Sequence, residues 1–229
     1  MPPTRRPLSS LLKLSSPPVA IAFVDAPPPG VDRVSSDEPA SCGYWRRAAE
    51  GQVFYTTADD HKRCPVGAHT HHVVLNDAEQ QELMGLVQTL VGLSYLKIEE
   101  VPQIPRRQTP LEVAVYAPLE AAPVAPDVVL VRGNARQLML LAEAAQSAGV
   151  TGAGPAMGRP TCAVLPEAIN TSRTSASFGC VGNRVYTGAT DTDAYFAIPG
   201  MHLDAIEERL AVIVAANDAL EQFHRARAQ

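Results

Sequence analysis

The chain lacks two features that would point to common classes of binding partner. It contains no apolar run of about 18 residues, which a membrane-spanning helix requires. It has no surplus of basic residues, since 19 Lys and Arg stand against 24 Asp and Glu for a net charge of −5 over 229 residues. A basic surface is the electrostatic requirement for binding nucleic acid. We therefore expect neither a membrane nor a nucleic acid as a partner.

The first residues also lack the pattern of a secretory signal. Arg5, Arg6 and Lys13 supply positive charge, but Pro7 and the serines at 9 and 10 interrupt the apolar stretch. A signal peptide needs a continuous apolar region of about 7–15 residues. We therefore expect a cytoplasmic protein, in which cysteines are normally reduced.

The chain does have many prolines and an ordinary share of apolar residues. Twenty prolines and 46% hydrophobic residues favour a globular, loop-rich domain with abrupt turns. Apolar periodicity predicts buried strands at 19–24, 53–55, 111–117, 128–131 and 194–198. It predicts helices at 8–14, 42–50, from 65 onwards, and at 77–93, 134–148 and 201–225. The fold class is thus α/β or α+β, with a mixed sheet and flanking helices. We expect residues 1–16 to form an N-terminal arm and residues 17–229 one compact domain.

Four cysteines are the main candidates for chemistry: Cys42, Cys64, Cys162 and Cys180. No two of them form a C-x-x-C motif, so spacing alone gives little evidence for a metal site. Three have Gly or Pro beside them, and thiolates are stabilised where backbone amides or helix starts face them. Their pattern leaves four alternatives open: unrelated buried thiols, a disulfide, a four-thiolate site for an iron–sulfur cluster or zinc, and a catalytic thiol.

Two further segments carry polar side chains of chemical interest. Four histidines lie around Cys64, at 61, 69, 71 and 72, and imidazole is a common metal ligand, although histidines at such positions are more often structural. The glycine-rich stretch 179–184 contains Asn183 and Arg184, and the planar guanidinium suits an anionic ligand. We expect these two residues to bind a small-molecule substrate. The chain contains no dinucleotide fingerprint, P-loop or G-x-S-x-G elbow.

Several motifs resemble those of DUF169, a bacterial and archaeal family catalogued as of unknown function. They are Cys64-Pro-Val-Gly-Ala, Tyr116-Ala-Pro-Leu, Pro126-Asp-Val-Val, Gly158-Arg-Pro-Thr-Cys, Ser177-Phe-Gly-Cys-Val-Gly-Asn-Arg and Ile198-Pro-Gly. The resemblance extends from about residue 17 to the terminal helix. It implies that all four cysteines fall within the family's motif blocks, which favours a shared four-cysteine site, but it supplies no activity.

These observations predict a metalloprotein in which Cys42, Cys64, Cys162 and Cys180 hold a cofactor. An iron–sulfur cluster, [4Fe–4S] in particular, is the favoured cofactor, with redox or cluster-assisted chemistry on a small anionic ligand or a redox partner. Zinc is the alternative, in a non-enzymatic binding module. A third hypothesis is an enzyme with Cys64 or Cys180 as nucleophile and His61 or His69 as base. The sequence predicts neither a substrate nor an oligomeric state.

Overall fold

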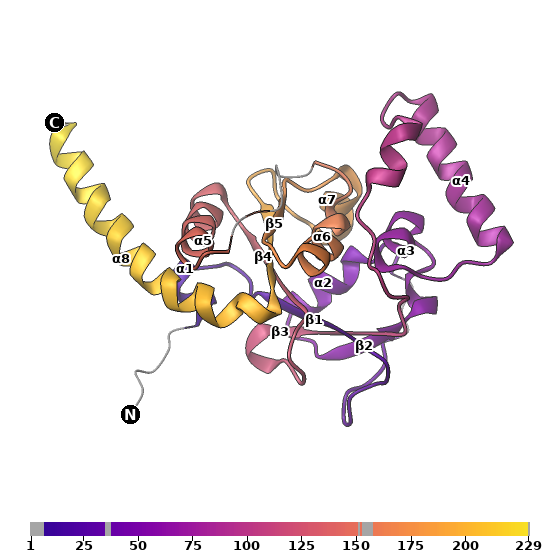
Figure 1. Ribbon diagram of the computed structural model, residues 1–229, viewed down its shortest axis with the longest axis horizontal. Helices are drawn as coiled ribbons and strands as arrows, with labels where there is room; N and C mark the ends of the chain where they lie inside the picture. The colour runs from indigo at the N-terminus through magenta and orange to yellow at the C-terminus, as the bar shows by residue number, and fades with distance from the viewer. Residues whose placement is uncertain (1–6, 35–37, 151, 153–157, 229) are drawn as a thin grey trace.

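A single six-stranded sheet forms the centre of the protein, as a computed structural model shows for residues 7–34, 38–150, 152 and 158–228 (Figure 1). The strand order is β2-β3-β1-β4-β6-β5, and every neighbouring pair is antiparallel. The strands are β1 (Val19–Val24), β2 (Phe54–Thr57), β3 (Val113–Pro118), β4 (Val128–Gly133), β5 (Ser175–Ser177) and β6 (Ala194–Pro199). The expected single domain with a sheet and flanking helices is confirmed.

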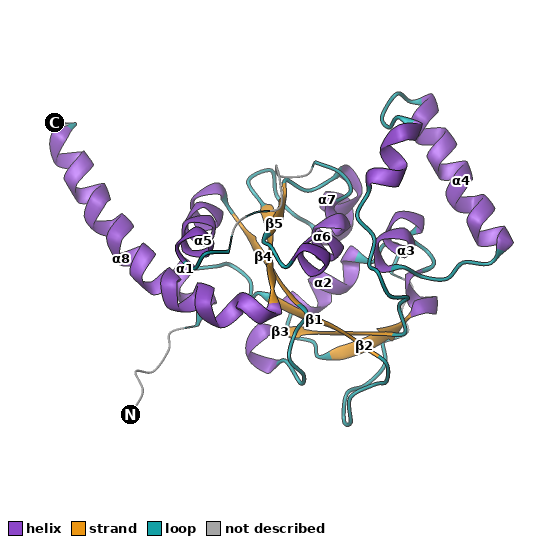
Figure 2. Ribbon diagram, in the orientation of Figure 1, coloured by secondary structure: helices purple, strands orange, loops and turns teal. Residues whose placement is uncertain are grey.

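Helices cover the sheet and connect its strands (Figure 2). The α-helices are α1 (Leu8–Leu12), α2 (Cys42–Ala49), α3 (Pro65–His71), α4 (Asp77–Gly92), α5 (Ala135–Ser147), α6 (Val164–Thr171), α7 (Val181–Thr187) and α8 (Leu203–Arg227). Short 3₁₀ helices are η1 (Ala58–His61), η2 (Ile98–Gln103), η3 (Leu119–Ala121), η4 (Thr161–Ala163) and η5 (Gly200–His202). In the described part of the chain, none of the helices has the length and apolar character that crossing a membrane requires.

The two faces of the sheet bury two different cores, because side chains alternate along each strand. Val128 and Leu130 of β4 pack in a core with residues of α2, α3 and α6. Val129 and Val131 of the same strand pack in a second core with residues of α1, α5 and α8. The first core contains three of the four cysteines at its centre or edge, so the chemistry of interest lies on this face.

The N-terminal helix α1 belongs to the second core. Leu8, Leu11 and Leu12 are buried there against the same cluster as residues of α5 and α8. Burying three leucines contributes several kcal/mol, at about 2 kcal/mol for each. The boundary placed at residue 16 stays a prediction, although these leucines tie α1 to the body of the protein.

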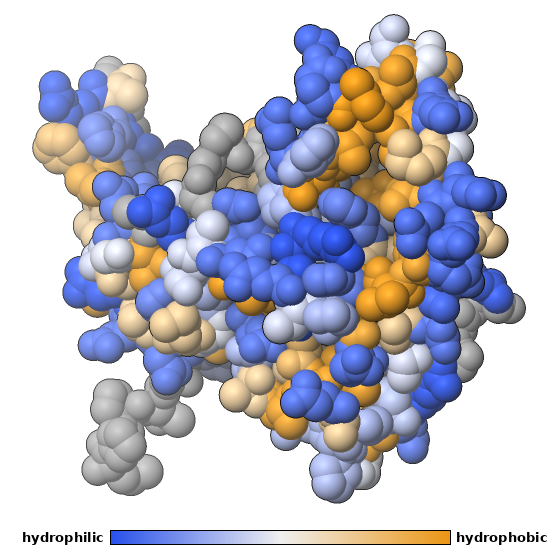
Figure 3. Space-filling view, turned by 45° about the vertical axis from the view of Figure 1, so that its right-hand side comes forward, coloured by the Kyte–Doolittle hydropathy of each residue, from blue (hydrophilic) through white to orange (hydrophobic). Residues whose placement is uncertain are grey.

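Helix α4 and the segment after it form an arm beside the body (Figure 1). The helix begins at a capping box in which Asn76 and Glu79 exchange side-chain and backbone hydrogen bonds. Val87 is its one buried residue, whereas Met84, Leu93 and Ile98 of the arm are exposed. Figure 3 shows the corresponding apolar surface over this arm. Capping at the start of α4 therefore stabilises the arm more than packing against the body of the protein does.

Candidate functional site

Cys42 and Cys64 lie where α2 and α3 begin, and a glycine lets the two helices meet. Cys42 is the first residue of α2, and Cys64 immediately precedes α3, where its sulfur accepts a hydrogen bond from the Gly67 N–H at 3.3 Å. A Cβ on Gly67 would lie 2.2 Å from the Ser41 Oγ and 3.2 Å from the Cys64 sulfur. Only glycine therefore allows this approach of α3 to the start of α2.

Cys162 and Cys180 approach the same face of the sheet from the other half of the chain. Cys162 is buried in the 3₁₀ turn η4, and Cys180 is the partly exposed residue before α7. The backbone N–H of Cys180 donates to the buried Thr161 hydroxyl at 2.6 Å. This bond ties the segment that carries Cys180 to the residue preceding Cys162.

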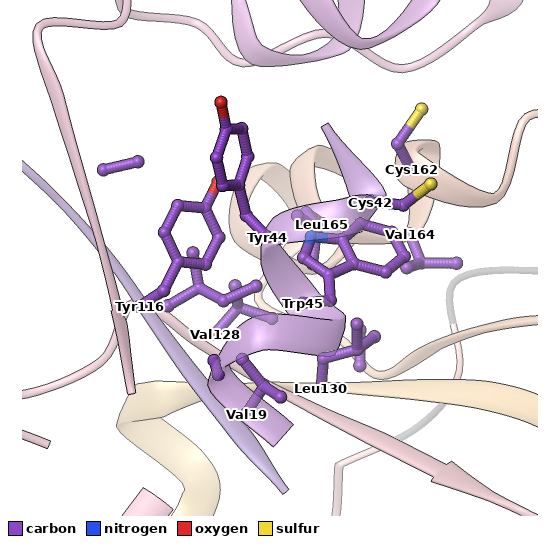
Figure 4. Packing of buried hydrophobic residues seen from close by; sticks show 14 of the residues in the cluster. Val19, Cys42, Tyr44, Trp45, Tyr116, Val128, Leu130, Cys162, Val164 and Leu165 are labelled. Atoms are coloured by element: carbon purple, nitrogen blue, oxygen red, sulfur yellow. The ribbon is translucent and has the colours of Figure 1, made fainter. Parts of the chain in front are cut away.

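The four thiols differ in burial, and this divides them into two classes. The pKa of the Cys42 thiol is raised to about 12, mainly by burial and to a lesser extent by the nearby Cys64 and Cys180, while Asn183 opposes the shift. Burial also raises the pKa of Cys162 well above its ordinary value, with additions from the other three cysteines. Figure 4 shows Cys42 and Cys162 next to each other at one end of the core. Cys42 and Cys162 are therefore buried thiols that remain protonated at neutral pH. Cys64 and Cys180 form the second class, because both are partly exposed.

The predicted four-cysteine metal site is wrong. Within the residues that the structure describes, no group of three or more His, Cys, Asp or Glu side chains is placed to hold a metal ion. The four cysteines are free thiols, spread over four separate elements of the fold. The iron–sulfur cluster, [4Fe–4S] included, and the zinc alternative are therefore set aside for Cys42, Cys64, Cys162 and Cys180.

The histidines around Cys64 are mainly core residues. The rings of His61 and His71 are fully buried and stack with centroids 4.8 Å apart. Both ring nitrogens of His61 are engaged, with the Thr56 hydroxyl at 2.8 Å and the Ser41 hydroxyl at 3.0 Å. The Nδ1 of His71 lies 2.9 Å from the Gly67 carbonyl oxygen. Burial lowers the pKa of both imidazoles, so both are neutral at pH 7.

His69 is the other histidine predicted as a base. Burial lowers its pKa, while a hydrogen bond with the Ile104 backbone opposes that shift. Its neighbouring charges are those of Arg106 and His72 rather than those of a thiol. With His61 occupied by two hydroxyl groups, the geometry gives no support to a cysteine–histidine pair of the kind that activates a nucleophile.

Asn183 and Arg184, the predicted substrate-binding residues, have different surroundings. Asn183 is 2% exposed, faces the Cys42 thiol and the Tyr195 hydroxyl, and lacks a hydrogen-bond partner of regular geometry for both amide atoms among the described residues. The Arg184 guanidinium donates to the carbonyl oxygens of Phe178, Thr190 and Asp193. It therefore fastens the loops on either side of α7. Substrate binding by these two residues stays a prediction. A ligand of Arg184 would compete with the three backbone carbonyl oxygens that already accept hydrogen bonds from its guanidinium.

Sequence reasoning missed three residues that shape this region. Gly67 and Thr161 fix the approach of the cysteine-bearing segments, and Tyr195 lies between Asn183 and Thr187. Gly67 had a usable signal, since it stands three residues after Cys64 in a helix that glycine would otherwise destabilise. The other two lie in turn and strand sequences of ordinary composition.

A family model matches residues 7–209 of this chain, which includes α1 and all four cysteines. The matched family is DUF169, described as "Uncharacterised ArCR". No curated protein and no solved structure was found to match the chain. Since the match covers far more than half of the sequence, the chain belongs to the DUF169 family.

Proposed function

We propose that the protein acts by thiol chemistry, with Cys64 as the attacking sulfur and a small disulfide as the substrate class. The proposal rests on the observation that two of the four thiols are buried and two are accessible. Cys42 and Cys162 are buried and protonated, whereas Cys64 and Cys180 are accessible. A thiolate is the nucleophile in thiol–disulfide exchange, so the accessible pair must carry any reaction.

The backbone distinguishes Cys64 from Cys180. The Cys64 sulfur accepts a hydrogen bond from the Gly67 N–H at 3.3 Å, which holds the sulfur in a fixed position at the start of α3. The Cys180 side chain accepts no such bond at the start of α7. We therefore assign the first attack to Cys64, with Cys180 as a slower second site.

The exchange step balances with the disulfide as the oxidant. The Cys64 thiolate attacks one sulfur of the substrate, whose S–S bond breaks and releases a thiolate that takes a proton from water. The product is a mixed disulfide at Cys64. Its resolution by the neighbouring Cys42 would require that thiol to lose its proton first, and the pKa of about 12 makes this slow at neutral pH. The mixed disulfide is therefore the long-lived state.

Reaction of the reduced, folded protein with 2-hydroxyethyl disulfide at pH 8 tests the assignment. Peptide mass spectrometry should find that Cys64 is modified first and Cys180 more slowly. Cys42 and Cys162 should react at a rate at least roughly tenfold lower than that of Cys180, because they are buried and protonated. In 6 M guanidinium chloride all four should react at similar rates.

Two variants make the test specific. Cys64→Ser should lose the fast phase, and the matched Cys180→Ser should keep it. Equal rates for Cys64 and the buried cysteines in the folded protein would contradict the proposal. So would fast modification that survives in Cys64→Ser, or purified protein whose thiols are blocked by a bound metal ion.

A further inference from the structure

The last turns of α8 project from the body of the protein (Figure 1). The buried residues of this helix lie in its first half, and Glu221 still pairs with Arg136 of α5 at 3.0 Å. We call residues 218–227 the tail; the structure describes all of them, and none is buried. Leu220 and Phe223 are each 54% exposed. The tail therefore presents apolar side chains to solvent.

The arm, taken as residues 77–103, is a second projecting element with an exposed apolar surface (Figure 3). Leu93 is 71% exposed and Ile98 is 56% exposed. Apolar surface that is exposed in this way is typical of sites that bind another protein. The arm is also acidic, because it has five carboxylates and one lysine, Lys97. The carboxylates are those of Asp77, Glu79, Glu82, Glu99 and Glu100.

The charges of the two surfaces are complementary. Two carboxylates of the arm are paired with basic residues of the body, and the other three form no ion pair within the described residues. Beyond Phe223, the charged residues of the tail are Arg225 and Arg227. Arg225 pairs with Glu221 of the same helix, whereas Arg227 lies 5.5 Å from the ring centroid of Phe223 and has no ion-pair partner in the described part of the chain. Arm against arm would bring carboxylates together, so a basic tail is the better partner for the arm.

The positions of tail and arm require a second copy of the chain. The two elements lie at opposite ends of the molecule, and both point towards the top of Figure 1. A tail therefore cannot reach the arm of its own chain. A two-fold axis perpendicular to that view, above the molecule, places the tail of each copy opposite the arm of the other. Both contacts then form together, and the assembly closes as a dimer.

We infer that two copies of this chain pair through these surfaces, with the tail of each packed on the arm of the other. The ring of Phe223 would cover Leu93 and Ile98. The guanidinium of Arg227 would lie among the unpaired carboxylates. Each contact is small, but the two act together, so we expect a dimer Kd of roughly 1–100 μM. The tail lies beyond residue 209, where the family match ends, and the pairing does not depend on the reactivity of the cysteines.

Sedimentation velocity at about 1 to 200 μM protein tests the pairing, with a reductant present so that no disulfide links the copies. The average mass should rise from that of a monomer towards that of a dimer, and not beyond. Phe223→Asp and Ile98→Asp should each weaken association roughly tenfold or more, with unchanged circular dichroism, because both positions are exposed. Val212→Asp, at an exposed position of α8 outside the tail, is the matched control and should pair like the wild type.

A mixture of the two variants makes the test specific. A mixed pair keeps one intact contact, between the tail of Ile98→Asp and the arm of Phe223→Asp, whereas neither variant alone keeps any. The mixture should therefore associate about threefold or more tightly than either variant by itself. A wild type that stays monomeric, growth beyond the dimer, or a mixture no tighter than its components would each overturn the inference. So would loss of pairing in Val212→Asp, or loss in Phe223→Asp but not in Ile98→Asp, since either result would indicate a contact between two α8 helices.

Discussion

Lowering the pH from 7.5 to 4.5 should destabilise the protein by several kcal/mol, with most of the loss below pH 6.5. The cause is the buried pair His61 and His71, whose pKa values burial lowers; that of His71 falls to about 4. Below pH 6.5 these imidazoles take up protons in the unfolded chain but not in the folded one. Stability is therefore complete above pH 6.5 and falls as the pH drops towards 4, by about 3 kcal/mol for His71 alone.

The surroundings of the pair explain why neither ring can accept a proton. His71 faces the Arg107 guanidinium, which opposes a second positive charge, and its Nε2 lacks a partner among the described residues. His61 packs against Tyr44 and Tyr116, and burial raises the pKa of Tyr116 so that its hydroxyl stays neutral; His61 also faces His71. No carboxylate is among the groups that shift either pKa, so a charged imidazole would be uncompensated.

Urea unfolding at a series of pH values measures the effect. His71→Phe keeps an aromatic ring in the stack but removes a titrating group, so its stability should depend less on pH between 6.5 and 4.5. His224→Gln, near the exposed end of α8, is the control and should show the wild-type dependence. A wild-type slope in His71→Phe, or an NMR titration of the His71 ring near pH 6.5 in the folded protein, would refute the explanation.

The surface carboxylates make the stability of the protein depend on pH in a different, lower range of pH. Backbone or arginine hydrogen bonds lower the pKa values of Glu79, Glu100 and Glu221 below the ordinary value of 4.5. Their stabilisation is present above pH 4.5 and is lost only as the pH falls further. The loss between pH 6.5 and 4.5 therefore reports on the histidines whose pKa burial lowers, which are His61 and His71 together with the partly buried His69.

Elements with strong local signals were predictable from the sequence. The strand Val19–Val24 is a continuous β-branched and apolar run, and the structure reproduces its bounds. Helix Asp77–Gly92 follows a capping box that the sequence displays. Helix Val181–Thr187 was missed, because Gly182 and β-branched residues disfavour helix there, and packing against α2 overrides that preference. Strand Ser175–Ser177 is short and polar and is held by pairing with β6.

The candidate site was predictable in position but not in chemistry. The proline after Cys64 correctly indicated the start of α3, whereas the glycine-rich stretch around Cys180 gave no indication of α7. The burial of Cys42 and Cys162, which decides their protonation, arises from packing of α2 and η4 against the sheet and has no local signal.

Replacing Gly67 by Ala should destabilise the protein by about 1–3 kcal/mol, although alanine is the better helix former. The new Cβ would lie 2.9 Å from the Cβ of Ser41 and 2.2 Å from its Oγ. Rotating the serine side chain cannot relieve the first of these contacts, so the backbone at the start of α2 has to move. Gly85→Ala in α4 is the matched control, because a Cβ there meets open space. It should stabilise the protein by up to about 1 kcal/mol.

Movement of the start of α2 in Gly67→Ala should also change the accessibility of the Cys42 thiol. Because Cys42 follows Ser41 directly, moving the start of α2 should expose it, and alkylation of Cys42 should be faster in Gly67→Ala than in the wild type. Ser41→Gly removes the two atoms closest to the new Cβ and leaves the Cys64 sulfur at 3.2 Å. The double variant should therefore be less destabilised than the sum of the two single changes, a coupling that a double-mutant cycle measures. Strict additivity, or an unchanged rate for Cys42 in Gly67→Ala, would show that α3 does not hold the start of α2 in place.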